Sequence, residues 1–138
     1  MERTDFMEKK RTFLCSSATI KEVREWIADL LLKRDAPPKF VNDVVLAASE
    51  AVTNSVVHSY ETTHEGPVDV RLLICGNAVH LKIRDYGAGL AIKNYQPPDL
   101  DTPHEGGYGL FLIHRLMDSV TVKPLDRGTE IHMIKQLP

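Results

Sequence analysis

Apolar and polar positions along the chain follow two periods, and the change from one to the other marks the predicted elements. Between 20 and 31 the apolar residues recur at helical spacing, and Pro37-Pro38 ends this first helix. Thr19 lies just before it and is expected to cap its N-terminus. A second helix is predicted from Pro38 to about Ser59, because proline is tolerated in a first turn.

Stretches with a period of two predict the strands. Apolar positions alternate from Val68 to Ile74, and after Gly76-Asn77 the alternation continues from Val79 to Ile83. A two-residue Gly-Asn connection suits a type II′ turn, so these two strands are predicted to form an antiparallel hairpin. Shorter runs predict further strands at 10–15, 120–122 and 129–134.

The order of the predicted elements indicates the fold class. Helical spacing returns at 110–117, so the elements run β-α-α-β-β-loop-α-β-β. This order predicts an α+β domain in which a layer of helices covers one face of a mostly antiparallel sheet. The segment from about 90 to 106 has no apolar period and predicts a long functional loop. A length of 138 residues predicts one domain spanning 1–138.

The second predicted helix has two different faces. An apolar stripe that includes Val41 and Val45 is expected to pack on the sheet. The other side of the helix carries Asp43, Ala47, Glu50, Ala51, Asn54 and His58. A polar face with two alanines, on a helix whose apolar stripe is already satisfied, predicts the floor of a ligand site.

Three short segments together predict a nucleotide site. Glu50 and Asn54 lie four residues apart and therefore on one helix face. The segment 85–89 (DYGAG) follows a strand, and its glycines let backbone approach a ligand closely. The segment 106–109 (GGYG) opens the third helix, where free N–H groups suit a phosphate. Each segment alone is common, as a solvated helix face or turn, but their joint order is specific. The chain has no Walker sequence, which argues against a P-loop enzyme.

These segments resemble the motifs of the Bergerat-fold (GHKL) ATPases and kinases, which include gyrase, Hsp90, MutL and sensor histidine kinases. EAVTNSVVH at 50–58 resembles their N box, and 85–89 the first glycine box. GYG at 107–109 resembles the second glycine box, and Gly128-Thr129 the third. Within this superfamily the chain most resembles the small stand-alone anti-sigma-factor serine kinases of bacterial partner-switching systems. The resemblance implies a two-layer Bergerat-type sandwich with a mixed, mostly antiparallel sheet, and it makes the loop at about 90–106 an ATP lid.

The resemblance also implies roles for individual residues. Glu50 would act as the general base on the attacking hydroxyl, and the Asn54 side-chain oxygen would bind Mg²⁺ between the phosphates. Asp85 would accept a hydrogen bond from the adenine amino group, with the Thr129 hydroxyl beside it. For Thr129 a plain structural role, as a β-branched strand residue, is equally consistent with the sequence. The other implied nucleotide-binding residues are Gly87, Gly89, Gly106, Gly107, Tyr108, Gly109 and Leu110.

One position departs from the family pattern. Some members carry an arginine just before the second glycine box, where it can reach the terminal phosphate, but this chain has Glu105. His104, Lys93 and Arg115 are the candidates to replace it, and the sequence does not choose among them. The departure puts the efficiency of phosphoryl transfer in question and leaves nucleotide binding largely untouched.

Charge and composition restrict the partners and the compartment. A formal net charge of -2 with balanced signs gives no electrostatic footprint for nucleic acid or an anionic membrane. No window approaches 18 apolar residues and no secretory h-region is present, so a cytoplasmic protein without a membrane span is expected. Cys15 and Cys75 have no metal-ligand partner at close spacing and are expected to be buried, reduced thiols.

The resemblance therefore implies an ATP- and Mg²⁺-dependent serine/threonine kinase that is also an anti-sigma factor. By resemblance, its substrate is a small STAS-domain anti-anti-sigma protein and its second partner is a sigma factor. A homodimer is expected by analogy alone. Two alternatives stay open: a non-catalytic module in which ATP regulates partner choice, and a kinase of a STAS stressosome-like scaffold that does not contact a sigma factor.

Overall fold

The computed structural model describes residues 6–16, 18–55, 66–87 and 108–138. In chain order its elements are β1 (Phe6–Leu14), α1 (Thr19–Leu32), α2 (Pro38–Asn54), β2 (Pro67–Cys75), β3 (Ala78–Asp85), α3 (Tyr108–Leu116), β4 (Ser119–Pro124) and β5 (Thr129–Gln136). The end of the second predicted helix, with Val56 and His58, lies outside the described residues, and so does the predicted lid.

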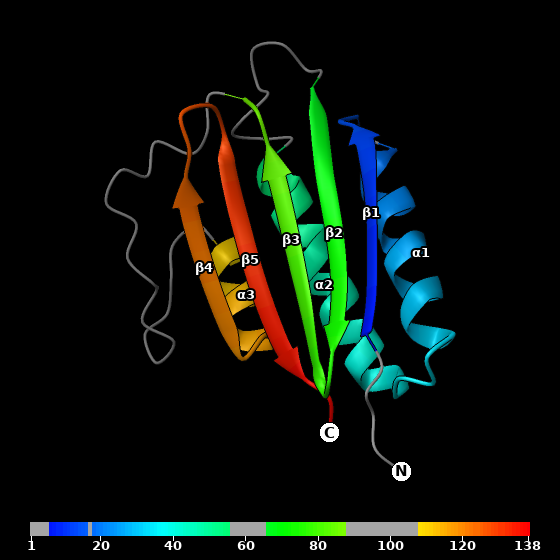
Figure 1. The fold of residues 1–138 in the computed structure, drawn as a ribbon. Coiled ribbons are helices and arrows are strands. Elements are labelled where there is room, and N and C mark those ends of the chain that lie inside the picture. Colours follow the sequence, from blue (N-terminus) through cyan, green and yellow to red (C-terminus); the bar gives the residue numbers. More distant parts are fainter. Residues whose placement is uncertain (1–5, 17, 56–65, 88–107) are drawn as a thin grey trace.

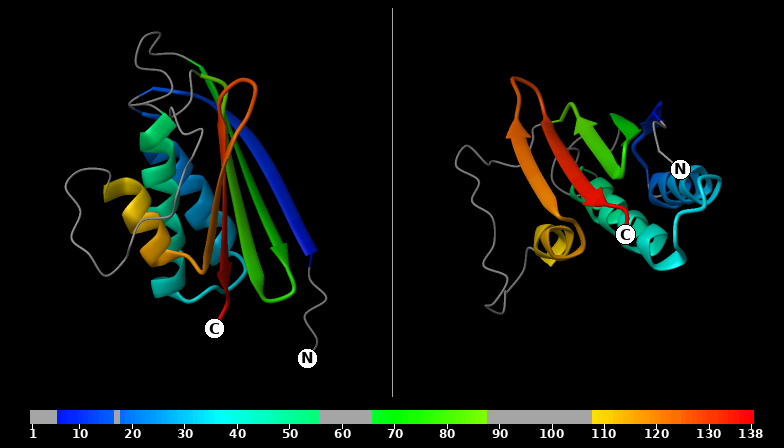
Figure 2. Two further views of the ribbon diagram at one scale, coloured as in Figure 1. Left: turned by 90° about the vertical axis from the view of Figure 1, so that its left-hand side faces the viewer. Right: turned by 60° about the horizontal axis from the view of Figure 1, so that its bottom comes forward.

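The five strands form one sheet in the order β1-β2-β3-β5-β4, and every neighbouring pair is antiparallel. All three helices of the described residues cover the same face of this sheet (Figure 1, Figure 2). The predicted α+β fold with helices on one face is therefore confirmed. No helix in the described ranges is long and apolar enough to cross a membrane.

The core lies between the sheet and the helices. Side chains alternate along β2 and β3, and the inward set is almost fully buried. This set comprises Val68, Val70, Leu72, Ile74, Val79, Leu81 and Ile83. Burying each such side chain contributes about 1.5–3 kcal/mol before the entropy cost of folding.

Helix α2 is the central helix, and it packs against α1 and α3 as well as the sheet (Figure 2). Ala47 and Ala51 are fully buried, since both have 0% relative accessibility and belong to the hydrophobic core. The prediction that they form the floor of a ligand site is therefore wrong. A helix with neighbours on both sides needs small residues for close packing, and the sequence pattern does not separate this need from a ligand floor.

Two further predictions fail. Thr19 does not cap α1, because Ala18 occupies the N-cap position and no side chain caps the helix. Its hydroxyl instead donates to the Leu14 carbonyl (2.5 Å) and accepts from the Ser16 N–H (2.8 Å), which closes the β1–α1 connection. Cys15 is buried as expected, but Cys75 is exposed at the end of β2; both thiols are free.

The β2–β3 hairpin has the predicted turn. Cys75 pairs with Ala78, so Gly76 and Asn77 form a two-residue loop. Gly76 has a φ of 61°, and in the described ranges Asp35 is the only non-glycine residue with positive φ. A positive φ at the first central residue alone is the type II′ geometry, which confirms the prediction.

The β4–β5 turn lies in close contact with the end of β3. Leu125 N–H donates to the Gly128 carbonyl (3.1 Å), and Gly128 has a φ of 88°. A Cβ at Gly128 would lie only 2.0 Å from the carbonyl oxygen of Asp85 and 2.8 Å from its carboxylate. The absence of a side chain is therefore what lets this turn approach Asp85.

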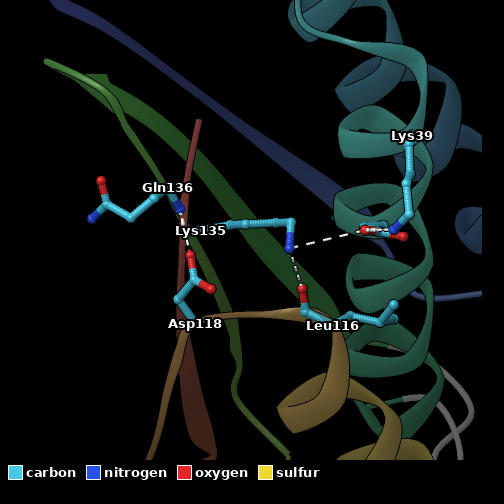
Figure 3. Close-up of polar contacts among 6 residues, drawn as sticks. Lys39, Leu116, Asp118, Lys135 and Gln136 are labelled. Carbon is cyan, nitrogen blue, oxygen red and sulfur yellow. Dashed lines mark hydrogen bonds and ion pairs between the residues drawn. The ribbon is translucent and has the colours of Figure 1, made fainter. Parts of the chain in front are cut away.

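Lys135 fixes the C-terminal end of α3 (Figure 3). Its ammonium group donates to the Leu116 carbonyl at 2.7 Å and lies 3.9 Å from the Asp43 carboxylate on α2. Next to it, the Asp118 carboxylate accepts the Gln136 N–H at 2.7 Å. A cation at a helix C-terminus is favourable because it meets the negative end of the helix dipole. Lys135 thus joins α3, α2 and β5.

The two positive-φ glycines of the described ranges allow a matched test of the turn contact. Gly76→Ala should cost only backbone strain, about 1–2 kcal/mol, because nothing lies within 4 Å of its Cβ position. Gly128→Ala should lower the free energy of unfolding by at least about 2 kcal/mol more, because the Asp85 backbone must move. Denaturant unfolding of both variants measures the difference, and equal losses would contradict the close approach.

A second pair of variants tests the α3 anchor. Lys135→Met keeps the aliphatic stem and removes the cation, so we expect a loss of about 1–2 kcal/mol in unfolding free energy. The control is Lys33→Met, which removes an exposed ion pair with Asp29 at 2.9 Å and should change stability by less than about 0.5 kcal/mol. If both variants had the stability of the unmodified protein, Lys135 would not anchor α3.

Candidate functional site

Three predicted site residues of the described ranges gather at one end of the sheet. Asp85 ends β3, and Thr129 begins the neighbouring strand β5. The C-terminal end of α2, with Asn54, lies at the same end of the molecule (Figure 1). Residues far apart in the sequence are brought together because β3, β5 and α2 all reach this edge.

Asp85 is a carboxylate in a core position. It continues the inward row of β3 after Ile83, and only 4% of the residue is exposed. Its Oδ2 accepts a hydrogen bond from the Ser55 hydroxyl (3.1 Å), while the N–H groups of Gly87 and Thr129 donate to Oδ1 (3.3 Å each). Burial of a charge is costly unless hydrogen bonds compensate it, and these three neutral donors provide the compensation.

Cys15 lies near this carboxylate. Burial, and after it the negative charge of Asp85, raises the pKa of the Cys15 thiol to about 11. The thiol is therefore neutral at pH 7 and unreactive as a nucleophile. Among the described residues no ion pair involves Asp85, so neutral hydrogen-bond donors stabilise its charge.

Among the described residues, three buried side-chain groups have no hydrogen-bond partner: the Thr129 hydroxyl, the Asn54 side-chain nitrogen and the Arg84 Nε. A buried polar group without a partner costs about 1–3 kcal/mol, and native structures contain few of them. Thr129 contacts the buried Asp85 carboxylate through its backbone N–H, so its unpartnered hydroxyl favours a polar ligand there. An adenine base fits this set, since its amino group can donate to Asp85 while a ring nitrogen accepts from a hydroxyl.

Glu50 lies on α2 one turn before Asn54, and it is partly exposed. Within the described residues no cluster of three or more His, Cys, Asp or Glu is arranged to hold a metal ion. A magnesium ion at Asn54 would thus take most of its oxygen ligands from phosphate and water, which is how Mg²⁺ usually binds with nucleotides. The residues present fit such an ion, and the roles of Glu50 and Asn54 stay predictions.

The remaining predicted residues divide into two groups. Tyr108 and Gly109 begin α3, and Leu110 is half-buried in its first turn. Three of the predicted nucleotide-binding glycines lie outside the described residues: Gly89, Gly106 and Gly107. The same is true of Lys93 and His104, two of the candidates to replace the arginine that some family members carry before the second glycine box. Arg115 is exposed in the last turn of α3, at the end opposite to the predicted phosphate position.

Sequence reasoning missed Ser55 and Tyr86 as individual residues. Ser55 directly follows Asn54, but its contact with Asp85 depends on how α2 meets the sheet. Tyr86 donates from its hydroxyl to Asp69 (2.5 Å), which also accepts from Thr12 (2.6 Å). Burial alone would raise the pKa of Asp69, but the hydrogen bonds from Thr12 and Tyr86 outweigh it and hold the pKa below its ordinary value. These hydrogen bonds hold the side chain of Tyr86, the residue after Asp85, on the outer face of the sheet.

A separate cavity of about 220 Å³ lies at the other end of the sheet, between the α1–α2 connection and the β2–β3 hairpin. Its lining includes Leu31, Ala36, Ile74 and Val79 but none of the predicted site residues. This volume is below the range of about 300–1,000 Å³ that is typical of small-molecule sites, so it does not suit a nucleotide. The unpartnered polar groups favour the Asp85 end.

Comparison with known proteins agrees with this geometry. The model of a family described as the histidine kinase-like ATPase domain matches residues 15–135. The chain is 31% identical to the anti-sigma F factor of Anoxybacillus flavithermus (strain DSM 21510 / WK1), over 83% of this chain and 82% of that protein. It is 33% identical to the serine-protein kinase RsbW of Staphylococcus epidermidis, over 88% of this chain and 82% of that protein.

A solved structure has the same fold. The structure of the RsbU and RsbW domains of a Mycobacterium tuberculosis protein aligns with a TM-score of 0.74 and 21% identity, over 95% of this chain and 32% of that chain. The resemblance inferred from the four sequence motifs is thus confirmed by the family model and by the relatives. This chain belongs to the family of histidine kinase-like ATPase domains.

Proposed function

We propose that this protein is an ATP-dependent serine/threonine kinase and anti-sigma factor that phosphorylates a STAS-type anti-anti-sigma protein. The observation that carries the proposal is the buried Asp85 carboxylate with an unpartnered Thr129 hydroxyl beside it. The relatives support the rest, since one is named an anti-sigma factor and another a serine-protein kinase, each aligned over more than four-fifths of both chains.

Asp85 selects adenine. Its buried carboxylate accepts the N6–H of the base, whereas guanine has a carbonyl at that position. Guanine would therefore place a carbonyl acceptor against the buried carboxylate with no donor between them, which is how a hydrogen-bonding site rejects the wrong ligand.

Residues at the ends of two helices would hold the phosphates of a bound nucleotide. The start of α3 supplies free N–H groups and a positive dipole end to them. Asn54 at the end of α2 would hold Mg²⁺, and the bound ion would supply positive charge to offset that of the phosphate oxygens. Glu50, one turn earlier, accepts the proton of a serine hydroxyl on the partner as that oxygen bonds to the γ-phosphorus. The bond between the γ-phosphorus and its bridging oxygen breaks, and ADP leaves.

The protein partners are a STAS-domain protein and a sigma factor. The unphosphorylated STAS protein displaces the sigma factor, and its phosphorylated form does not, so the kinase reaction returns the sigma factor to this protein. The ATP lid couples nucleotide state to this exchange, and the active form is a homodimer in the cytoplasm. The alternative of a non-catalytic module is favoured by one observation, the presence of Glu105 where some relatives of the superfamily carry arginine.

Phosphotransfer from labelled ATP to the STAS proteins of the same genome tests the proposal. Glu50→Gln should keep nucleotide affinity and lose about 10²-fold or more in single-turnover rate, because the general base is removed. Asn54→Ala should lose both Mg²⁺-dependent binding and turnover. Glu25→Gln is the matched control, since Glu25 lies exposed on α1, and it should retain full activity.

The outcomes separate the alternatives. ATP binding without transfer to any STAS protein would identify a non-catalytic module. Transfer without sigma-factor binding in a pull-down would identify a scaffold kinase. Full activity of Glu50→Gln would remove the general-base role while leaving the kinase assignment intact.

A further inference from the structure

We propose that Ser55 is a positioning residue for adenine recognition: its hydroxyl orients the Asp85 carboxylate and so sets the preference for a purine with a 6-amino group. This inference rests on the proposed function, because it requires ATP binding at the Asp85 end of the sheet. Ser55 itself does not contact the nucleotide. It acts through Asp85.

Ser55 is buried, with 2% exposure, and its Oγ lies 3.1 Å from Asp85 Oδ2. The other acceptor within reach is the Ala51 carbonyl, at 3.4 Å. A hydroxyl has one proton, and a carboxylate is the stronger acceptor. The shorter contact and the charge both favour donation to Asp85.

The two oxygens of Asp85 have different donors. Oδ1 faces the backbone N–H groups of Gly87 and Thr129, which no side-chain substitution removes. Oδ2 depends on Ser55, which is the one side-chain donor to Asp85 among the described residues. Ser55 is therefore the position at which a substitution changes the carboxylate orientation while Asp85 itself is retained.

Orientation matters because the carboxylate torsion is soft. The terminal torsion of aspartate has broad minima, so its hydrogen-bond partners fix the plane of the group. A hydrogen bond prefers an angle above about 150° and weakens steeply below about 120°. Without Ser55 the carboxylate can turn toward the unpartnered Thr129 hydroxyl, and it then no longer faces the adenine amino group.

The backbone of Ser55 is held firmly. Its N–H donates to the carbonyls of Ala51 and Val52, and its φ and ψ are helical. The residue before it is Asn54, the predicted Mg²⁺ ligand. Two adjacent residues at the end of α2 therefore act on the two ends of one nucleotide: Asn54 on the phosphates and Ser55, through Asp85, on the base.

The test compares two triphosphates that differ only in the 6-amino group, ATP and purine riboside triphosphate, by calorimetry with Mg²⁺. Ser55→Ala should weaken ATP binding about tenfold, the loss of one charge-assisted hydrogen bond, and leave purine riboside triphosphate almost unchanged. The matched control is Ser49→Ala on the same helix. Ser49 is buried and donates to the Val45 carbonyl at 2.9 Å, away from Asp85. For Ser49→Ala, the ratio of the affinities for ATP and purine riboside triphosphate should equal that of the unmodified protein.

Ser55→Cys provides a second variant of nearly the same volume with a weak donor, and its ratio should fall between those of serine and alanine. If Ser55→Ala does not fold, this variant carries the test alone. An unchanged ratio in every folded Ser55 variant, or an equal loss for both ligands, overturns the inference and leaves ATP binding established. If the unmodified protein binds neither triphosphate, the proposed function is wrong, and the inference about Ser55 is wrong with it.

Discussion

The structure depends on a negative charge held in a core position. Asp85 occupies the place that the alternation of β3 reserves for an apolar side chain, yet it is 4% exposed and has no cation partner among the described residues. Its neighbours follow from this constraint: Gly128 has no side chain because a Cβ would meet the Asp85 backbone, and Thr129 and Gly87 direct N–H groups at the carboxylate. Neutral donors stabilise the carboxylate by hydrogen bonds and do not cancel its charge, so it can still accept a hydrogen bond from a ligand.

Strand β5 connects the Asp85 end of the sheet, where we propose that the base binds, with the helix predicted to bind phosphate. Its inward row begins with Thr129 beside Asp85 and ends with Lys135, which holds the C-terminal carbonyl of α3. The same sheet therefore fixes the Asp85 carboxylate and the C-terminal end of α3. Helix α2 lies between α1 and α3, and its C-terminal turn carries Asn54 and Ser55 to the edge where β3 ends. Helices and strands, rather than loops, position Glu50, Asn54, Asp85 and Thr129, whereas Gly87 lies in the bend after β3.

The order and type of the elements could be predicted because they depend on local periodicity. The II′ turn followed from Gly76-Asn77, and the nucleotide motifs followed from residue spacing. The failures concern tertiary contacts. Ala47 and Ala51 pack inside the core, Thr19 binds the β1–α1 connection, and Cys75 is exposed at a strand end. The contacts of Ser55 and Lys135 could not be predicted either, since they join elements that the chain order does not place side by side. The roles of Glu50 and Asn54 remain predictions.

The most direct test of the central claim is the nucleotide preference of the Asp85 site. Calorimetry with ATP, ADP and GTP in Mg²⁺ should show binding of both adenine nucleotides and much weaker binding of GTP. Asp85→Asn should weaken ATP binding by about 1–3 kcal/mol, because the buried pairing is lost. Equal affinity for ATP and GTP, or ATP binding that Asp85→Asn leaves unchanged, would contradict the account of a buried carboxylate that recognises adenine.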